Sequence, residues 1–446
     1  MRYPFSVICI PNYLAICIPA CLVTLLFSGN VAALDARSIA LGGSTISNGS
    51  GVHGALENPA TLMHLQNLGE RAHFQMGASV DLRDSANVAD IVDENPDLVD
   101  DFETEIDALS GQTVSCDIIT ANADTVCLTD TAELGALSAS ALNILNTIDG
   151  QNLGGQAAFD IGFAKTNSSI PFGIHLRVMA TGIATPNVAD SDKNYTSVIA
   201  DTLSDDILTF GEISDNIEYA VETTGLSLSL RQPEDTFEST AEVAALLRTQ
   251  LGISLARTFT VNGHNYDIGI TPKFSKLEAG FIDVDVADQF TENNESLSDQ
   301  FENSNTESNS TTFDFGVSTQ LTNRPIRVAA VLRNAISESI SLANYTFETT
   351  PQLILGGSYQ LPNATINADL ALNKAKLDNL ESQKIGLGIE WQKSSIAIRA
   401  GISHDAARDD SATALSLGLG LGPLELGTRL TDTNEGQFGL QLAFSY

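Results

Sequence analysis

The chain has 446 residues, 56 acidic against 22 basic side chains, and a formal net charge of −34. Such an excess of negative charge argues against a nucleic acid as a partner and is compatible with surfaces that face water and cations. Beyond residue 33, no apolar stretch approaches the roughly 20 residues of a membrane-spanning helix. A membrane-embedded form must therefore cross with strands.

Residues 1–33 have the pattern of a secretory signal peptide. Arg2 precedes an apolar run over 5–27, and small residues lead up to Ala33, after which we expect cleavage. An uncleaved anchor is the alternative, although two prolines interrupt the run. A lipoprotein site at Cys21 is a second alternative, which the proline two positions before it disfavours.

Residues 34–68 form a short, turn-rich segment ahead of the first expected strand. Its Gly-Gly pair can adopt backbone conformations closed to other residues, and its Asn-Pro-Ala sequence favours a turn. We interpret the segment as a compact hatch, with an ordinary loop leading into the first strand as the alternative. The residues that carry this interpretation are Gly42, Gly43, Asn58, Pro59 and Ala60.

Residues 86–149 break the strand pattern. Apolar residues recur at helical spacing over 88–109 and 134–148, which predicts a helical pair in the lumen or at one mouth of a barrel. Between these runs lie Cys116 and Cys127, the two cysteines outside the signal peptide. In an oxidising compartment they are a disulfide candidate, with two free thiols as the alternative.

The remainder, 69–446 apart from these exceptions, alternates between apolar and small or polar residues. Several alternating segments approach the 9–11 residues of a tilted transmembrane strand, and the second face is rich in Gly, Ser and Thr. The pattern predicts an all-β, closed antiparallel transmembrane barrel of about 14 strands; a soluble sandwich or solenoid is the alternative. Alternation is clear around residues 226–230, 251–255, 313–317, 328–332, 353–355, 385–391, 396–402, 415–421 and 437–446.

The last alternating segment also resembles the assembly signal of outer-membrane barrels. Its apolar positions end on an aromatic residue at the C-terminus, in the set Leu440, Leu442, Phe444 and Tyr446. The resemblance implies two partners, the barrel assembly machinery and outer-membrane lipid. An apolar strand edge is what such a machinery could grip before the barrel closes.

Residues 283–309 are acidic, polar and nearly free of aliphatic side chains, which predicts a long water-exposed loop. Asp283, Asp285 and Asp288 could ligate calcium, but the glycine and terminal glutamate of a calcium loop are missing. The six histidines are scattered, and no nucleophile, phosphate-binding or dinucleotide motif is present. We therefore predict no enzyme activity, no cofactor and no metal.

Four segments, in the same order along the chain, resemble the outer-membrane-type family named conjugal transfer protein TraF. They are the Asp-Ala-Arg-Ser…Gly-Gly…Asn-Pro-Ala opening at 35–62, Leu-Gly-Ile-Ser-Leu-Ala-Arg at 251–257 with Ile-Gly-Ile-Thr-Pro-Lys at 268–273, Pro-Gln-Leu…Gly-Gly at 351–357, and Ile-Arg-Ala-Gly-Ile-Ser-His-Asp at 398–405. The opening is also similar, more distantly, to the hatch of FadL-type barrels. The thioredoxin-like pilus-assembly protein that is also called TraF is a different molecule, since its CxxC is absent here.

The resemblance implies a Gram-negative outer-membrane protein that passes or binds a small hydrophobic compound. No ligand residue of the FadL-type barrels maps onto this chain. The alternative is a non-transport role in envelope assembly, secretion or conjugation, in which the acidic loop or the helical insert binds another protein. A soluble periplasmic β-protein is the third hypothesis.

Overall fold

The computed structural model of the 446-residue chain describes most of the sequence after residue 34. Residues 67, 82–84, 112–119, 124–128, 207–209, 217–221 and 226–230 are described by their backbone only. The described residues are 35–49, 51–67, 71–84, 112–119, 124–128, 131–151, 153–204, 207–209, 217–221, 226–230, 237–285, 304–322, 324–342, 345–378, 380–407, 413–431 and 436–445.

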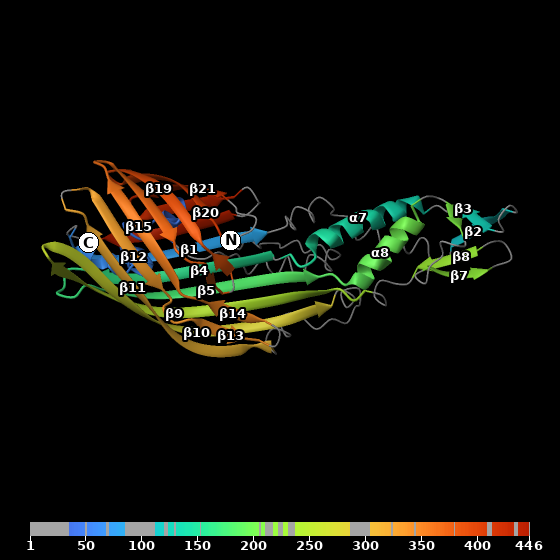
Figure 1. Cartoon of the computed structure of the whole chain (residues 1–446), viewed down its shortest axis with the longest axis horizontal. Coiled ribbons are helices and arrows are strands. Elements are labelled where there is room, and N and C mark those ends of the chain that lie inside the picture. The colour runs from blue at the N-terminus through green and yellow to red at the C-terminus, as the bar shows by residue number, and fades with distance from the viewer. Residues whose placement is uncertain are drawn as a thin grey trace, which may run out of the picture.

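Fourteen antiparallel strands close into a barrel (Figure 1). Because β1 pairs with both β23 and β4, the sheet has no free edge, as a strand-built membrane protein requires. The predicted closed antiparallel barrel of about 14 strands is therefore confirmed. In order around the barrel, the strands are β1 (Ala72–Asp84), β23 (Gly436–Ser445), β22 (Leu424–Leu430), β21 (Thr413–Leu421), β20 (Ile396–Asp405), β19 (Lys384–Lys393), β16 (Ala364–Ala371), β15 (Gln352–Gln360), β12 (Ile326–Arg333), β11 (Thr306–Gln320), β10 (His264–Asp285), β9 (Thr240–Val261), β5 (Phe172–Asn187) and β4 (Leu153–Lys165).

The two faces of the barrel wall differ as the two-residue period predicts. On β21, Leu415 and Leu417 are 64% and 63% exposed on the outside, whereas Ser416 between them is buried on the inside. On β23, Phe438 is exposed and Gln437 is buried. Large apolar side chains cover the outer surface on strand after strand, an arrangement that suits lipid acyl chains rather than water.

The two ends of the barrel differ in their connections. At one end the strands are joined by short segments, residues 166–171, 262–263, 321–325, 361–363, 394–395 and 422–423. We call this the short-turn end. At the other, the long-connection end, the longest connections are 85–152, 188–239, 286–305 and 334–351.

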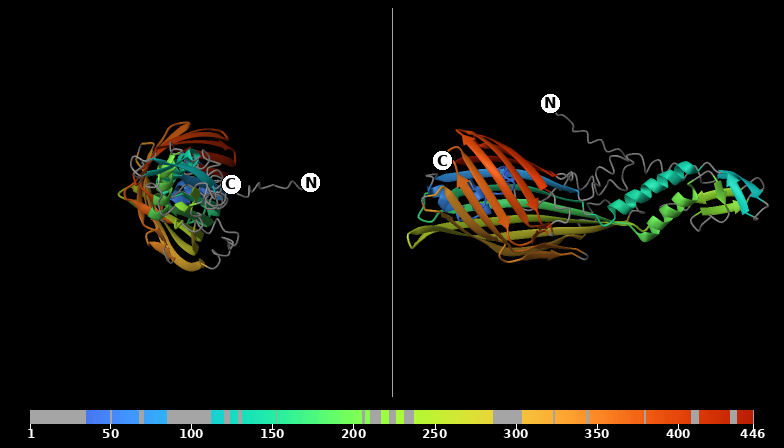
Figure 2. Two further views of the ribbon diagram at one scale, coloured as in Figure 1. Left: turned by 90° about the vertical axis from the view of Figure 1, so that its right-hand side faces the viewer. Right: turned by 45° about the horizontal axis from the view of Figure 1, so that its top comes forward.

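A separate module projects from the long-connection end (Figures 1 and 2). The helices α7 (Ala132–Ile148) and α8 (Asp190–Thr202) pack against each other. Asp149, at the end of α7, accepts hydrogen bonds from the Val188 backbone at 3.0 Å and from Lys193 Nζ on α8 at 2.6 Å. The hydrogen bond from Lys193 holds the pKa of the Asp149 carboxyl below its ordinary value. Beyond the helices lies a sheet in the order β6 (Ile207–Thr209), β3 (Asp124–Leu128), β2 (Gln112–Ile119), β8 (Leu226–Leu230) and β7 (Ile217–Val221).

This module bears on three expectations. The helix at 132–148 packs against α8, which periodicity did not reveal. Of the two places expected for the helical insert, the lumen or one mouth of the barrel, the pair lies on the side of one mouth, beyond the long-connection end. The other predicted helical run, 88–109, lies outside the described residues. The alternating segment 226–230 is a strand of the projecting sheet, because its backbone pairs with β2 and β7 and with no barrel strand.

The acidic loop is also shorter than predicted. Residues 283–285 belong to β10 and 306–309 belong to β11, since their backbones continue the ladders of those strands. Residues 286–303 lie outside the described part of the chain. Among the described residues, no helix is both long and apolar enough to cross a membrane.

The barrel interior holds two further elements. Helices α2 (Ala36–Ala40), α3 (Gly51–Glu57) and α4 (Thr61–Asn67) lie inside the wall (Figure 1), with every described side chain buried or half-buried. Toward the long-connection end, two hairpins fold inward; Phe347 and Ile340 of the first pack against Leu246 and Leu277 on the inner faces of β9 and β10. The hairpins are β13 (Glu338–Ser341) with β14 (Thr346–Thr349), and β17 (Ala375–Leu377) with β18 (Leu380–Ser382).

Candidate functional site inside the barrel

Residues 35–67, which we call the plug, occupy the lumen as three short helices joined by turns. The first helix is started by Asp35, whose carboxylate accepts a hydrogen bond from the backbone of Arg37 at 2.8 Å. It is ended by Gly42, which adopts a φ of 64° that favours glycine. Helices this short are marginal in isolation, so their packing inside the barrel stabilises them.

One side of the plug rests on glycines of the barrel wall. Gly388 pairs with Gly401, and Gly418 pairs with Gly427, which pairs in turn with Gly439. We call these five residues, contributed by the five neighbouring strands β19 to β23, the glycine seat. A Cβ atom on any of them would lie within 2.1–2.6 Å of the plug between residues 36 and 42. Only glycine lets the two backbones approach this closely.

The Asn-Pro-Ala turn of the plug has a similar fit on β10 and β11. Asn58 donates from Nδ2 to the Ile46 carbonyl at 3.0 Å and accepts from the Ala60 backbone at 3.1 Å, so it ties two turns of the plug together. Gly316 faces Asn58, and Gly269 faces the Pro59–Ala60 peptide. The residues selected from the sequence thus all belong to the plug, but they face different parts of the wall: Gly42 contacts β19 and β20, whereas Asn58 to Ala60 contact β10 and β11.

Buried charges fix the plug to the wall elsewhere. Arg37 donates from Nε and Nη2 to the two carboxylate oxygens of Glu390, at 2.8 and 3.1 Å, and both side chains are less than 10% exposed. Arg399 of β20 binds the same Glu390 carboxylate and also Glu425, at 2.9 Å. A bidentate pair of this kind fixes the orientation of the two side chains and also strengthens their interaction.

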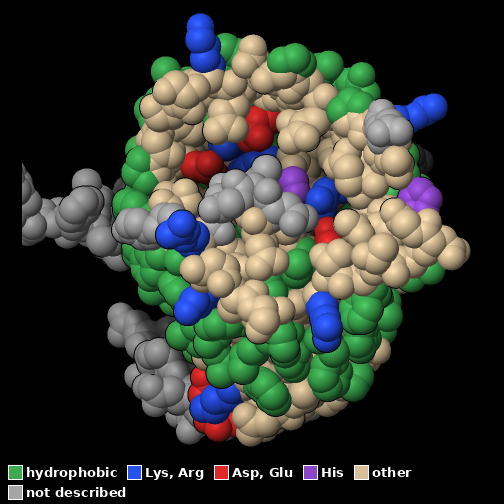
Figure 3. All heavy atoms as spheres, turned by 90° about the vertical axis from the view of Figure 1, so that its left-hand side faces the viewer, with side chains coloured by type: hydrophobic (Ala, Val, Ile, Leu, Met, Phe, Trp, Pro, Cys, Tyr) green, Lys and Arg blue, Asp and Glu red, His purple; other side chains and the backbone are tan. Residues whose placement is uncertain are grey.

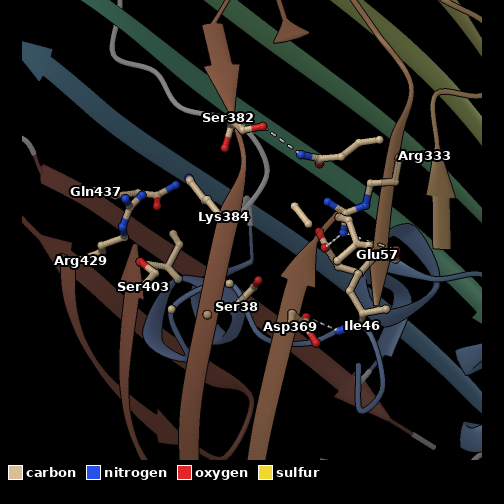
Figure 4. A pocket seen from close by; sticks show the side chains of 17 residues that line it. Ser38, Ile46, Glu57, Arg333, Asp369, Ser382, Lys384, Ser403, Arg429 and Gln437 are labelled. Atoms are coloured by element: carbon tan, nitrogen blue, oxygen red, sulfur yellow. Dashed lines mark hydrogen bonds and ion pairs between the residues drawn. The ribbon is translucent and has the colours of Figure 1, made fainter. Parts of the chain in front are cut away.

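Three further anchors hold the plug between residues 45 and 57. Asp369 Oδ2 accepts hydrogen bonds from the backbones of Thr45 and Ile46 at 2.7 and 2.9 Å. Figure 4 shows Asp369 beside Ile46. The His53 ring lies 2.5 Å from Asp160 of β4. Glu57 binds Arg333 of β12. We call the wall residues Asp160, Arg333, Asp369 and Glu390 the polar anchors.

A cavity of about 70 Å³ lies between the plug and the inward hairpins. Leu56 and Glu57 of the plug line one side, and Thr350 and the β17 region line the other. Its walls carry the charged side chains Arg177, Arg248, Lys273, Asp314, Arg333 and Lys376. A space of this size admits a few water molecules or a small solute. We call it the chamber.

The hairpin side of the chamber is closed by its own ionic cluster. Arg248 of β9 binds both Glu338 and Asp378, and all three side chains are 3% exposed or less. It also donates to Thr349 at 2.8 Å. In contrast, Arg177 Nε and Nη2 are buried without a hydrogen-bond partner among the described residues.

The other residues selected from the sequence lie outside this interior. Leu440 and Phe444 are exposed on the outer face of β23, Leu442 is half-exposed there, and Tyr446 lies outside the described residues. Backbone pairing places Cys116 of β2 opposite Cys127 of β3 in the projecting module. Among the described residues, no group of three or more His, Cys, Asp or Glu side chains could hold a metal ion.

Sequence reasoning missed the polar anchors and the role of the glycines. The sequence signal for the anchors is a charged residue at an inward position of a strand face otherwise built from small residues, as at Glu390 after Gly386 and Gly388. Such a charge needs a buried partner. No pattern in the sequence identifies Arg37, 353 positions earlier, as this partner.

Several solved structures are similar to this chain at low sequence identity. A TodX monoaromatic hydrocarbon channel with the deltaS2 mutation is 11% identical, with a TM-score of 0.45, covering 92% of this chain and 97% of that one. A Pseudomonas aeruginosa FadL homologue is 11% identical, with a TM-score of 0.39 and coverages of 94% and 99%. The P. putida toluene transporter TodX is 12% identical, with a TM-score of 0.38 and coverages of 93% and 99%.

The comparison with curated proteins gave no match. Among protein families, residues 55–370 match the one described as F plasmid transfer operon, TraF, protein. The match spans the second half of the plug and the barrel as far as β16, including the projecting module. The resemblance to this family is therefore confirmed, and the match contains the segments 251–273 and 351–357 and the end of the opening segment, whereas 398–405 lies beyond it. With well over half of its residues matched, the chain belongs to the family described as F plasmid transfer operon, TraF, protein.

Proposed function

We propose that the protein is an outer-membrane barrel that admits a small solute through a lumen gated by its plug. The observation that carries the proposal is the chamber, which lies between the plug and the inward hairpins and is lined by both. A solute reaches it from either end only when one of these two closures moves. The proposal assigns the protein no catalytic activity and no cofactor.

The chamber walls favour a polar solute over the hydrophobic compound expected from the sequence. Arg177, Lys273 and Arg333 reach the cavity, and desolvating such groups against an apolar ligand would be costly. A polar solute with hydrogen-bond acceptors would instead satisfy the free nitrogens of Arg177.

Uptake into proteoliposomes tests the proposal. The full chain and a variant lacking residues 35–67 are compared with small polar solutes and with small aromatic hydrocarbons of similar size. We expect the deletion to raise the uptake of polar solutes well above that of the full chain. Equal uptake by both proteins would refute gating by the plug. A deletion that increased only the uptake of hydrocarbons would instead indicate a hydrophobic solute.

A second candidate function is a non-transport role in envelope assembly or secretion. It is favoured by the projecting module, whose helices and sheet extend well beyond the barrel (Figure 2). Deleting residues 86–149 together with 190–236 separates the two functions. Loss of a cross-linked envelope partner with unchanged solute uptake would support the second candidate, whereas loss of uptake alone would support the first.

A further inference from the structure

The short-turn end of the barrel carries a ring of exposed basic side chains. None of the five forms an ion pair among the described residues. They lie just before β1, at the last residue of β4, near the end of β9, in the turn between β11 and β12, and at the last residue of β19. We call this set the basic rim: Arg71, Lys165, Arg257, Arg324 and Lys393.

No exposed acidic side chain accompanies the basic rim in the described part of the short-turn end. Asp267 and Glu390 are buried in the interior, where they pair with Arg327 and Arg37. Lys and Arg side chains stand around the edge of this end in Figure 3. The rim is therefore a site of positive charge in a chain whose net charge is −34.

The long-connection end has the opposite character. The connection 85–152 contains 14 of the 56 acidic residues and none of the 22 Lys and Arg. Asp283 and Asp285, at the end of β10, are exposed on the same side. The charge of the chain is thus divided between its two ends, and the division places the basic rim away from the excess of acid.

The rim continues the apolar outer face of the barrel. On β4, the exposed side chains Phe159 and Phe163 are followed at the next outward position by Lys165. On β19, Ile389 and Trp391 are followed in the same way by Lys393. A long basic side chain at this position can lie along the apolar surface while its charge reaches the edge of the membrane.

Aromatic side chains mark the same level. Phe444, Phe74 and Phe163 are register partners on three neighbouring strands, and all three are exposed on the outside. On β9, Arg257 lies 5.7 Å from the centre of the Phe259 ring. Rows of exposed aromatic residues are typical of the interface between the acyl chains and the headgroups of a bilayer.

We propose that the basic rim binds the headgroups of anionic phospholipids in the leaflet at the short-turn end. The proposal rests on the membrane-embedded barrel of the proposed function and adds its lipid partner and its orientation. Short turns of outer-membrane barrels face the periplasm, so the projecting module would face the cell exterior. The headgroup of a phospholipid, rather than a free anion, is indicated because the rim borders the surface that faces acyl chains.

Native mass spectrometry of the full chain in detergent tests the proposal without any measurement of passage. Phosphatidylglycerol and phosphatidylcholine with the same acyl chains are offered to three proteins. These are the wild type, a rim variant (Lys165→Gln, Arg324→Gln, Lys393→Gln), and a control with the same charge removed elsewhere (Lys193→Gln, Lys276→Gln, Lys374→Gln).

We expect the wild type and the control to retain phosphatidylglycerol in preference to phosphatidylcholine. The rim variant should bind phosphatidylglycerol about tenfold more weakly, since each basic side chain at a membrane surface adds attraction to anionic lipid. A rim variant that binds as the wild type does would overturn the proposal, as would a wild type without preference. Failure here leaves gated uptake in proteoliposomes untouched, so the two proposals fail separately.

Discussion

The plug meets the barrel wall in two different ways. On β19 to β23 it lies directly on the glycine seat, where uncharged atoms of residues 36–42 meet the glycine backbones of the wall. Elsewhere the polar anchors hold it through buried charges and charge-assisted hydrogen bonds. These anchors lie on β4, β12 and β16 and, as Glu390, on β19. The first contact depends on shape alone, whereas the second can be loosened by competing charges or solutes.

This difference indicates which contacts would yield during opening. A steric fit against rigid strands is insensitive to salt and to solutes, because it contains no group that they can bind. Buried ion pairs persist only while both partners stay in place. A solute in the chamber would reach Arg333 and Glu57 first, since both line it.

The largest effect is expected from Glu390→Leu. The substitution leaves the Arg37 and Arg399 guanidinium groups buried without their shared carboxylate. Removing one partner of such a cluster costs about 3–5 kcal/mol in the free energy of unfolding. Denaturant titration of the barrel in detergent measures it, with Glu348→Leu, whose ion pair with Lys376 is exposed, as the control. A loss no larger than that of the control would show that the anchor contributes nothing.

A smaller effect is expected from Gly427→Ala in the glycine seat. The new Cβ would lie 2.1 Å from the Ala36 carbonyl oxygen, so the plug or the strand must shift at a cost of about 1–3 kcal/mol. Gly357→Ala is the matched control, because a Cβ there meets nothing within 4 Å. Limited proteolysis and denaturant titration should both distinguish the two variants. Equal behaviour would contradict the close contact between plug and wall.

Asp369→Asn should lower the free energy of unfolding by less than either of these substitutions. One side-chain oxygen remains to accept from the backbones of Thr45 and Ile46, but the charge is lost. The expected loss is about 1 kcal/mol, the difference between a charged and a neutral acceptor. Amide hydrogen exchange at Thr45 and Ile46 reports it directly. Unchanged exchange, compared with Asp283→Asn at an exposed position, would remove Asp369 from the anchors.

The smallest effect is expected in the projecting module, at the partly exposed ion pair between Asp149 and Lys193. Because the folded pKa of Asp149 is lowered, its stabilisation is present above the unfolded pKa of about 3.9 and is lost as pH falls through the lower folded value. A partly exposed pair such as Asp149–Lys193 contributes about 0.2–1 kcal/mol. The protection of α7 and α8 from hydrogen exchange, relative to the intrinsic rate at each pH, should therefore weaken at low pH in the wild type. In Lys193→Met this pH dependence should shrink, and an unchanged profile would contradict the assignment.

The barrel itself could be predicted from the sequence, because lipid outside and a crowded lumen inside impose a two-residue period that single strands display. The alternation of Gln437 and Phe438 is enough to assign one to the inner and the other to the outer face of the wall, even when the neighbouring strands are unknown. Two elements escaped the same reasoning. The segment around Leu226 alternates like a barrel strand, although it pairs in the projecting sheet, and α8 is too polar for its periodicity to be visible.

The plug could be placed before the barrel but not inside it. Gly42 and Asn58 marked unusual turns, and the structure gives the reason in their close contact with Ile402 and Gly316. The ion pair between Arg37 and Glu390 joins residues 353 positions apart, and no local pattern carries that information. Glycines alternating along β21 indicated a face of small residues, but only the closed barrel shows what fills the space above them.

Whether the plug closes the lumen can be measured as ion conductance across a planar bilayer. The full chain and the variant without residues 35–67 are measured at equal insertion. We expect the full chain to conduct little and the deletion to open steady channels, with Glu390→Leu giving intermittent openings between these limits. Identical conductance of the full chain and the deletion would contradict this expectation.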